Sequence, residues 1–365
     1  MNCLHRRVAW TTALCSLLAA PLNAQSQSGF LMAGYGTTTY EGVTQGSYRN
    51  DFTVSVSPVL LYTKGSDFLF EAELEFGLSG AATSTTLEYA QIDYLGFENV
   101  QLIAGKFLVP FGVFGERLHP SWINKLPTAP ILFGHGHGGV AEGALLPILT
   151  DAGFMMRWTQ SMGTSWALDF SGYVTQGPSI AAEAGDGHDD HEADPDLVTL
   201  VAPKVALGVA FSDNNKNKML GGRLGVVNGG AFEMYASGFH SMYDADNYLD
   251  FYAAALSAEW RTGGLEVRAE GARVWQEFQE LNQFSTLIKT GLYVQSSYRV
   301  GSWEPVVRWG RLEDATVDAG TVQDGHNELA LGLVYWLDPT VPLKVAWEIH
   351  EGRSDEFAIQ WAFGF

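Results

Sequence analysis

Apolar and polar residues alternate along most of this chain. In the stretch FLFEAELEF, at positions 68–76, the even positions are apolar, whereas Glu71, Glu73 and Glu75 occupy odd positions. Successive side chains of a β-strand point to opposite faces, so this pattern predicts a strand with one apolar and one charged face. The same pattern recurs at 265–270. A helix would instead scatter these charges around its circumference.

Segments with this two-residue period continue to the last residue of the sequence. Read in order, they predict sixteen strands, at 29–40, 51–62, 68–79, 84–95, 99–106, 151–159, 164–175, 217–227, 230–241, 249–261, 264–275, 287–299, 303–313, 326–337, 342–350 and 354–365. The stretch 201–211 could form a further strand. We place it in a loop, because one added strand would reverse the order of short and long connections after it.

The connections between predicted strands alternate in length. Short turns at 64–67, 96–99, 228–230 and 262–264 take turns with longer polar loops. This alternation is typical of transmembrane β-barrels, and an even number of strands lets the first and last strands pair. A soluble β-sandwich also has many alternating strands, but its surface would not carry such aromatic-rich apolar faces. The predicted fold class is all-β, a transmembrane antiparallel β-barrel of about sixteen strands.

The composition agrees with a barrel. Apolar residues make up 46% of the chain, and no run of 18 apolar residues follows position 24, so the sequence excludes membrane-spanning helices. Barrel strands escape this test, because residues that face lipid alternate with residues that face the lumen.

The first residues have the features of a secretory signal peptide. Arg6 and Arg7 precede a mostly apolar stretch at 8–22, which is followed by a small residue and then a polar run. Such a charged start and short apolar stretch are removed on export. We therefore expect a signal peptide at 1–24 and a single barrel domain at 25–365.

Cysteine usage and charge narrow the class of protein further. Both cysteines, Cys3 and Cys15, lie within the expected signal peptide. The exported domain must then hold together without disulfides, which fits a bacterial envelope protein. The net charge is −20, or −22 without Arg6 and Arg7. Nucleic acid is excluded as a partner, because binding it requires a basic surface.

One segment carries a more specific signal. The sequence GKFLVPFG, at 105–112, follows the fifth predicted strand and precedes a long loop. It resembles the porins related to the phosphate-selective family of Gram-negative outer membranes. The resemblance implies sixteen strands, a usually trimeric assembly, and a long third loop that folds into the pore. The loop at 107–150 would then be the constriction loop.

The charges predicted to face the lumen differ from those of phosphate-selective porins, which owe their anion preference to a ladder of basic residues. Here the inward positions mix both signs, with Glu71, Glu73, Glu75, Glu266 and Glu270 opposed by Arg157, Arg223, Arg268 and Arg308. Rings of carboxylates favour cations where they line the narrow part of a channel. The sequence therefore predicts a weak preference for cations.

The candidate constriction residues lie in and beside the long loop. They are Lys106, Glu116, Arg117, His119 and Lys125. Loops of this length are uncommon unless they are functional or disordered. The alternative interpretation is an extracellular cap that leaves the pore open.

Two histidine-containing segments suggest a metal as an alternative ligand. His135 and His137 lie in the long loop, while His188 and His191 lie in the acidic run GDGHDDHEADPD of the predicted extracellular loop at 176–216. Imidazole and carboxylate together suit zinc, nickel or copper. The run has no fixed ligand spacing, however, and a solvated acidic loop could concentrate cations through its charge alone.

The sequence offers little support for an enzyme or a structural anchor. His240 next to Ser241, and His350 near Ser354, are the nearest candidates for a nucleophile and base. Neighbours in sequence do not make a catalytic triad, so we predict no enzymatic activity. A closed anchor or adhesin is disfavoured, because barrels of sixteen strands leave an aqueous lumen unless they are plugged.

The terminal strand predicts that the barrel is inserted into the outer membrane. Phe357, Trp361, Phe363 and Phe365 would face lipid, and this ending resembles the signal by which the barrel-assembly machinery recognises its clients. Amphipathic tryptophan rings suit the membrane interface, and four of them are expected to form a girdle there: Trp158, Trp260, Trp303 and Trp336.

These observations together predict an outer-membrane channel of a Gram-negative bacterium. It would let small hydrophilic solutes or ions diffuse passively and would need no cofactor. Its partners would be membrane lipid, the assembly machinery and its solutes, with a homotrimer implied by the resemblance. A divalent-metal-ion channel that uses the histidine-rich loops is the alternative.

Overall fold

The computed structural model describes residues 28–43, 50–80, 82–133, 144–180, 202–207, 215–280 and 283–365, most of which are in β-strands. Sixteen long strands form the wall: β1 (Gly29–Val43), β2 (Asn50–Lys64), β3 (Phe68–Ser79), β4 (Ala82–Phe97), β5 (Val100–Leu108), β6 (Thr150–Met162), β7 (Trp166–Thr175), β10 (Met219–Asn228), β11 (Phe232–Met242), β12 (Asp250–Thr262), β13 (Leu265–Glu280), β14 (Gln283–Tyr298), β15 (Trp303–Leu312), β18 (His326–Asp338), β19 (Val341–His350) and β20 (Glu356–Gly364). Among the described residues, no helix has the length and apolar character needed to cross a membrane.

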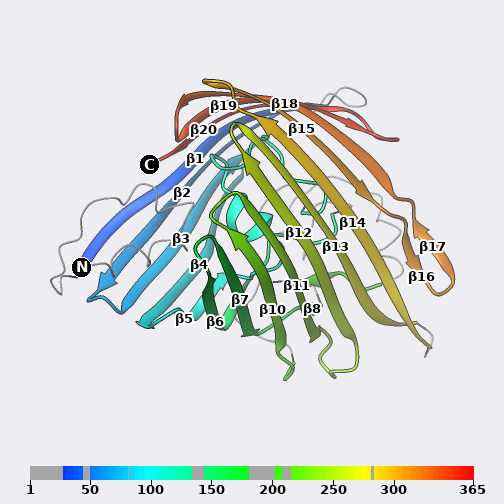
Figure 1. The fold of residues 1–365 in the computed structure, drawn as a ribbon. Helices are drawn as coiled ribbons and strands as arrows, with labels where there is room; N and C mark the ends of the chain where they lie inside the picture. The colour runs from blue at the N-terminus through cyan, green and yellow to red at the C-terminus, as the bar shows by residue number, and fades with distance from the viewer. Residues whose placement is uncertain are drawn as a thin grey trace.

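The wall strands form one closed antiparallel barrel. Each wall strand pairs with the wall strand before and after it in sequence, and β20 returns to pair with β1, as Figure 1 shows. Each of the sixteen predicted strands corresponds to one of these strands, so the predicted barrel and its strand number are confirmed. Closure matters physically because it leaves no open edge of unpaired backbone groups in lipid.

Four further short strands are present among the described residues. β8 (Ser179–Ile180) and β9 (Val205–Ala206) pair as a separate two-stranded sheet. β16 (Ala315–Val317) and β17 (Gly320–Gln323) form a hairpin in the connection from β15 to β18, and β16 also pairs with β14, so this hairpin extends the wall sheet. The stretch around β9 therefore does not add a wall strand, as predicted. The β16–β17 hairpin was not predicted from the sequence.

The two faces of the wall strands differ as the alternation predicted. In β15, every second residue is exposed, beginning with Trp303, and the residues between them are buried, beginning with Glu304. The closed barrel makes the buried face the interior, so in β15 Trp303 and Trp309 point outward toward lipid, whereas Glu304 and Arg308 point inward.

The predicted tryptophan girdle is wrong at one position. Trp260 and Trp303 are about half exposed on the outer face. In contrast, the indole Nε1 of Trp336 donates a hydrogen bond to Glu304 Oε2 at 2.8 Å, which places this ring inside. Trp336 and the inward-facing Glu328 are an even number of residues apart on β18, so alternation places both side chains on the same face.

The seam between the first and last strands depends on glycines. Gly34 and Phe365 exchange two backbone hydrogen bonds of 2.9 Å each. The Phe365 and Phe363 rings lie over Gly34 and Gly36, where an added Cβ would come within 2.7 Å and 2.6 Å of them. Aromatic rings that cover glycines of a neighbouring strand hold the register of a sheet. The predicted pairing of the two terminal strands is thus confirmed.

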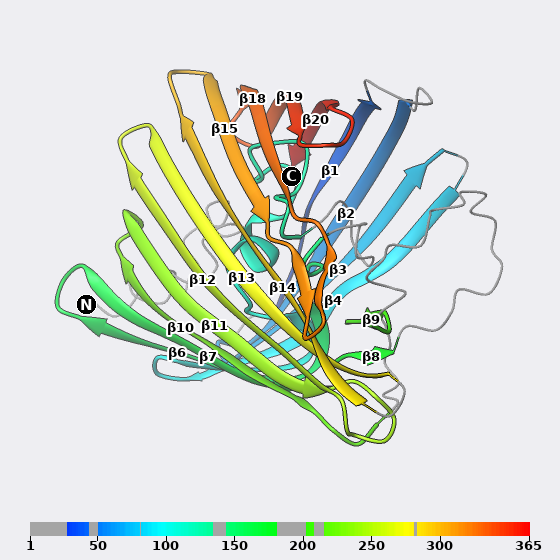
Figure 2. The ribbon, with the colours of Figure 1, turned by 90° about the vertical axis from the view of Figure 1, so that its right-hand side faces the viewer.

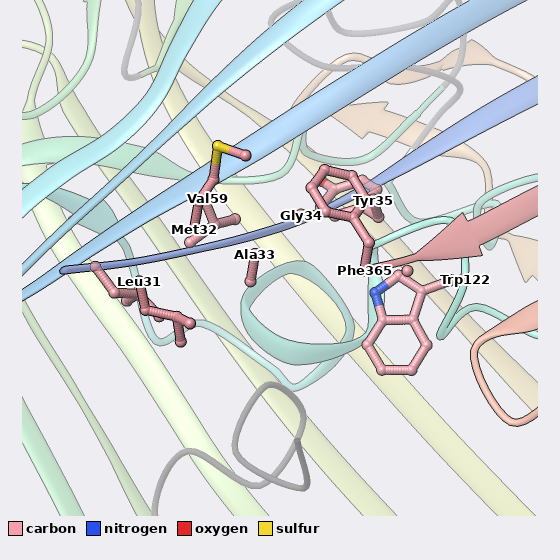
Figure 3. Close-up of a pocket in the computed structure, with 10 residues that line it drawn as sticks. Leu31, Met32, Ala33, Gly34, Tyr35, Val59, Trp122 and Phe365 are labelled. Atoms are coloured by element: carbon pink, nitrogen blue, oxygen red, sulfur yellow. The ribbon is translucent and has the colours of Figure 1, made fainter. Parts of the chain in front are cut away.

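An apolar pocket opens beside this seam (Figure 3). β1 begins at Gly29, and its residues before Gly34 extend past the end of β20 alongside β2. The pocket is lined by this extension, by β2 and by Trp122, which comes from the connection between β5 and β6. Trp122 lies against Gly364, where an added Cβ would be 3.2 Å from the indole ring.

Replacing Gly34 with alanine should weaken the seam. The new Cβ would lie 2.6 Å from the Ser57 carbonyl oxygen as well as against Phe365. Overpacking of this kind costs about 1–3 kcal/mol. We expect Gly34→Ala to lower the temperature at which the folded, heat-modifiable band is lost in electrophoresis.

Gly271→Ala is the matched control. Gly271 also lies on a wall strand, but its added Cβ would make only ordinary contacts, at 3.4 Å or more. Equal heat resistance of the two variants would show that the glycine–phenylalanine packing does not limit the stability of the seam.

Candidate functional site: the barrel interior

A segment between β5 and β6 packs against the inside of the wall. Residues 109–133 of this connection are mostly buried, and Figure 2 shows them, in cyan, within the ring of strands. Phe111, Phe114 and Leu132 belong to one apolar cluster with wall residues such as Tyr293 and Phe239. We call residues 109–133 the inner segment.

Glycines on the wall make room for the inner segment. An added Cβ at Gly291 would lie 2.7 Å from Leu132, and one at Gly310 would lie 2.7 Å from Ile131. Gly332 faces Leu126 in the same way. β14, β15 and β18 therefore present backbone where other inward positions present side chains, and the apolar residues of the segment fill the space.

The motif GKFLVPFG positions the start of the inner segment. Gly112 has φ +65° and lies against the Glu270 carboxylate, so no other residue would fit there without strain. Its N–H donates to Ser237 Oγ at 2.9 Å. The next two N–H groups, of Val113 and Phe114, donate to the Glu270 oxygens at 3.3 and 3.2 Å. Glu270 thus accepts hydrogen bonds from the first turn of the short π-helix η2 (Phe114–Leu118).

Two charged residues of η2 bind opposite charges on the wall. Glu116 forms an ion pair with Arg157 at 2.5 Å and a second one with Arg223. Burial alone would raise the pKa of Glu116, but Arg223 and Arg157 outweigh it and lower the pKa to about 2. Arg117 pairs with Glu233 at 2.6 Å. These three ion pairs therefore anchor η2 to β6, β10 and β11.

The second half of the inner segment is anchored in the same way. Lys125 Nζ lies 2.6 Å from Glu304 and 3.5 Å from Glu266. Arg308 donates to the Thr128 carbonyl and hydroxyl oxygens, both at 3.0 Å. Further hydrogen bonds run from the Lys344 amine to the Ser121 carbonyl oxygen and from the Gln360 amide to the Pro127 carbonyl oxygen.

The predicted constriction residues lie in several environments. Glu116, Arg117 and Lys125 are all ion-paired with the wall, as described above. Lys106 lies on β5 and donates to the Leu87 carbonyl oxygen at 2.6 Å, so it is directed along the wall. His119 is buried within the segment, 9% exposed. Whether these residues set the exclusion size stays a prediction.

The predicted lumen charges form groups that their sequence positions did not reveal. Arg157 and Arg223 meet at Glu116, while Arg268 bridges Glu259 at 3.0 Å and Glu266 at 2.9 Å. The wall partners Glu233 and Ser237 were missed as site residues. Alternation along β11 could have predicted that both side chains face inward. It could not have predicted that they contact a segment more than 100 residues away in the sequence.

A second region of the interior is acidic. Glu71, Glu73 and Glu75 lie on β3, and Glu88 and Asp93 lie on β4. The Tyr35 hydroxyl donates to Glu73 at 2.6 Å, and the amides of Gln91 and Gln101 donate to Asp93, both at 2.9 Å. Neutral donors orient these carboxylates without cancelling their charge. We call these five residues the acidic wall.

The structure locates some of the remaining predicted residues but not others. His135, His137, His188 and His191 lie outside the described residues. Phe357, Trp361, Phe363 and Phe365 are on the outer face, and their role in assembly stays a prediction. His240 contacts Asp250 at 2.8 Å, but Ser241 is fully buried on the opposite face of β11, so the two do not converge.

No protein-family model and no curated protein matches the chain. Solved structures do resemble it. OmpF of Salmonella typhi, in a complex with daunomycin, matches with a TM-score of 0.59 and 12% identity over 92% of this chain and 97% of its own. The outer-membrane channel DcaP of Acinetobacter baumannii matches with 0.59 and 12%, over 95% and 100%. The trimer form of OmpT of Vibrio cholerae matches with 0.58 and 9%, over 93% and 99%.

The chain has the barrel fold of the outer-membrane porins. At these identities the likeness concerns the fold, and the solute must be argued from the chain's own residues. The predicted relation to the phosphate-selective porins is not tested by these three structures and stays a prediction.

Gly112→Ala should loosen the inner segment. The added Cβ meets Glu270 and requires a left-handed backbone, each of which destabilises the docked segment. We expect trypsin to cut the folded barrel after Arg117 or Lys125 at least several times faster than in the unchanged protein. Limited proteolysis followed by mass spectrometry measures this.

Gly115→Ala serves as the control in the same segment. Its nearest neighbour would be 3.7 Å away, at Ile148, so the docked position should be kept. If Gly112→Ala is cut no faster than Gly115→Ala, Gly112 and Glu270 do not hold the segment in place.

Proposed function

We propose that this protein is a channel in the outer membrane of a Gram-negative bacterium, through which small hydrophilic solutes or ions diffuse passively. The observation that carries the proposal is a closed barrel of sixteen strands with an apolar outer face and a charged interior. Barrels of this size leave an aqueous lumen unless they are plugged. The similarity to OmpF and to DcaP supports the same function.

The inner segment would be the constriction of this channel. All of its hydrogen bonds and ion pairs described above run to β6 or to wall strands from β10 onward. We infer that it fills that side of the interior and leaves the passage beside β3 and β4. Its own charges would contribute little to selectivity, because Glu116, Arg117 and Lys125 are each paired with opposite charge.

The acidic wall would give the channel a weak preference for cations. It places five carboxylates on β3 and β4, beside the inferred passage. The nearest basic residue of β6, Arg157, is already bound to Glu116. A net negative potential along a water-filled path raises the local concentration of cations and lowers that of anions.

Neutralising part of the acidic wall should reduce this preference. We expect Glu71→Gln with Glu75→Gln to lower the ratio of cation to anion permeability by about twofold for each charge removed. A carboxylate about 8 Å from an ion in water contributes about 0.5 kcal/mol without salt and about 0.2 kcal/mol at about 0.1 M salt. This energy has opposite signs for a cation and an anion, so the permeability ratio changes by about twofold. The measurement is the reversal potential of single channels in a potassium chloride gradient.

Glu313→Gln is the control for this experiment. Glu313 is an exposed carboxylate paired with Arg311 at 2.9 Å, so its removal should leave the reversal potential unchanged. A channel that prefers chloride would refute the cation preference, and a folded protein that shows no conductance in bilayers would refute the channel itself.

The proposed partners follow from the fold. Exposed aromatic and aliphatic residues cover the outer face and suit membrane lipid. The OmpT structure is a trimer form, and we propose a homotrimer here too, which native mass spectrometry in detergent would test. Recognition of the terminal strand by the assembly machinery remains part of the proposal. The metal-ion alternative rests on histidines outside the described residues.

A further inference from the structure

Three residues on β18 and β19 bring metal-binding atoms together on the inner face of the barrel. Glu328 and His350 are direct cross-strand partners. Glu348 lies two residues before His350, so its side chain is on the same face of β19. The ligand atoms of the three side chains lie within 4.8 Å of one another.

Two of these atoms are buried and unpartnered. Glu348 is 1% exposed and the His350 side chain is 10% exposed. Glu348 Oε2 and His350 Nε2 have no hydrogen-bond partner, and they are 3.9 Å apart. That distance is too long for a hydrogen bond between them. Leaving buried polar atoms unpaired costs free energy, so such a pair calls for an explanation.

The separation of the two atoms fits a shared metal ion. Two ligand atoms that each lie about 2.0–2.1 Å from a tetrahedral zinc ion are about 3.3 Å apart. Small rotations of the Glu348 and His350 side chains would close the remaining difference. A bound ion would satisfy both atoms at once, which a single proton shared over 3.9 Å cannot do.

The surroundings hold the carboxylates in place. Arg308 donates to Oε1 of Glu328 at 3.0 Å and to Oε1 of Glu348 at 2.9 Å. The Thr128 hydroxyl, from the inner segment, also donates to Glu348 Oε1. These contacts leave Glu348 Oε2 available. Hydrogen bonds to the second oxygen of a ligating carboxylate are how proteins orient metal ligands.

The local charge also favours a cation. Glu328 and Glu348 together carry two negative charges, and the one guanidinium that contacts both is Arg308. The balance leaves one negative charge that a divalent ion would compensate. An imidazole nitrogen with two carboxylate oxygens suits zinc and similar transition metals, whereas calcium and magnesium prefer oxygen ligands alone.

We propose that Glu328, Glu348 and His350 form a binding site for a divalent transition-metal ion such as zinc. The ion would lie on the inner face of β18 and β19, where Thr128 connects it to the inner segment. None of its three ligands is a histidine at 135, 137, 188 or 191, and the proposal does not depend on the solute that the channel carries.

Zinc titration by calorimetry tests the site. The full chain, purified and folded in detergent, would carry His135→Ala, His137→Ala, His188→Ala and His191→Ala, so that those side chains cannot bind the added zinc. We expect one zinc ion to bind per chain in this background. His350→Ala should weaken zinc binding at least tenfold or abolish it.

Two further variants separate a loss of zinc binding from a loss of folding. Glu348→Gln retains an oxygen for Arg308 and Thr128 and removes only the free carboxylate oxygen, so it should fold normally and also weaken binding. His240→Ala should bind zinc unchanged, although His240 likewise contacts a carboxylate, Asp250, at 2.8 Å. Heat-modifiable migration in electrophoresis confirms that each variant is folded.

Crystals soaked in zinc chloride supply the second measurement. Anomalous density at the zinc absorption edge between Glu348 and His350 would support the site. Equal zinc affinity of the His350→Ala variant and its parent, or zinc density elsewhere only, would overturn it. Neither measurement requires conductance, so a failure of the channel proposal would remain distinguishable from a failure of this one.

Discussion

Closure of the sheet between β1 and β20 is the constraint on which the rest of the structure depends. In hydrocarbon an unpaired backbone group costs several kcal/mol, so an open edge cannot persist. The seam fixes the alignment of β1 with β20, and every wall strand between them is aligned on its neighbours. Phe363 and Phe365 contribute to that register by covering Gly36 and Gly34.

A second constraint is that the inner segment, which is long and irregular, must be held inside the barrel. Its backbone and charged groups must find partners there. Glu270 and Ser237 accept hydrogen bonds from the start of the segment, and ion pairs bind its charged side chains. The wall glycines Gly291 and Gly310 admit its apolar residues. Because buried ion pairs are costly to break singly, these contacts fix one position rather than merely adding stability.

The sequence predicted the wall much better than the interior. Alternation with a period of two is a local pattern, so strands such as β13 could be predicted without knowledge of tertiary contacts. Counting the alternation along β18 would also have predicted that Trp336 faces the interior. The contact of Gly112 with Glu270 joins positions 158 residues apart, and no local pattern encodes it. The motif GKFLVPFG indicated a special backbone, but its partner depended on which strand faces the segment.

Ion pairing inside the barrel weakens the effect that many interior charges can have on selectivity. Arg117, Arg157 and Lys125 all lie inside, yet each is bound to a carboxylate, so each acts on a passing ion mainly as part of a dipole. Paired charges produce fields that fall off faster with distance than those of single charges. In the proposed channel, the residues that would shape the potential along the passage are therefore those held by neutral donors. Glu73 and Asp93 are of this kind, because a tyrosine and two glutamines orient them without supplying positive charge.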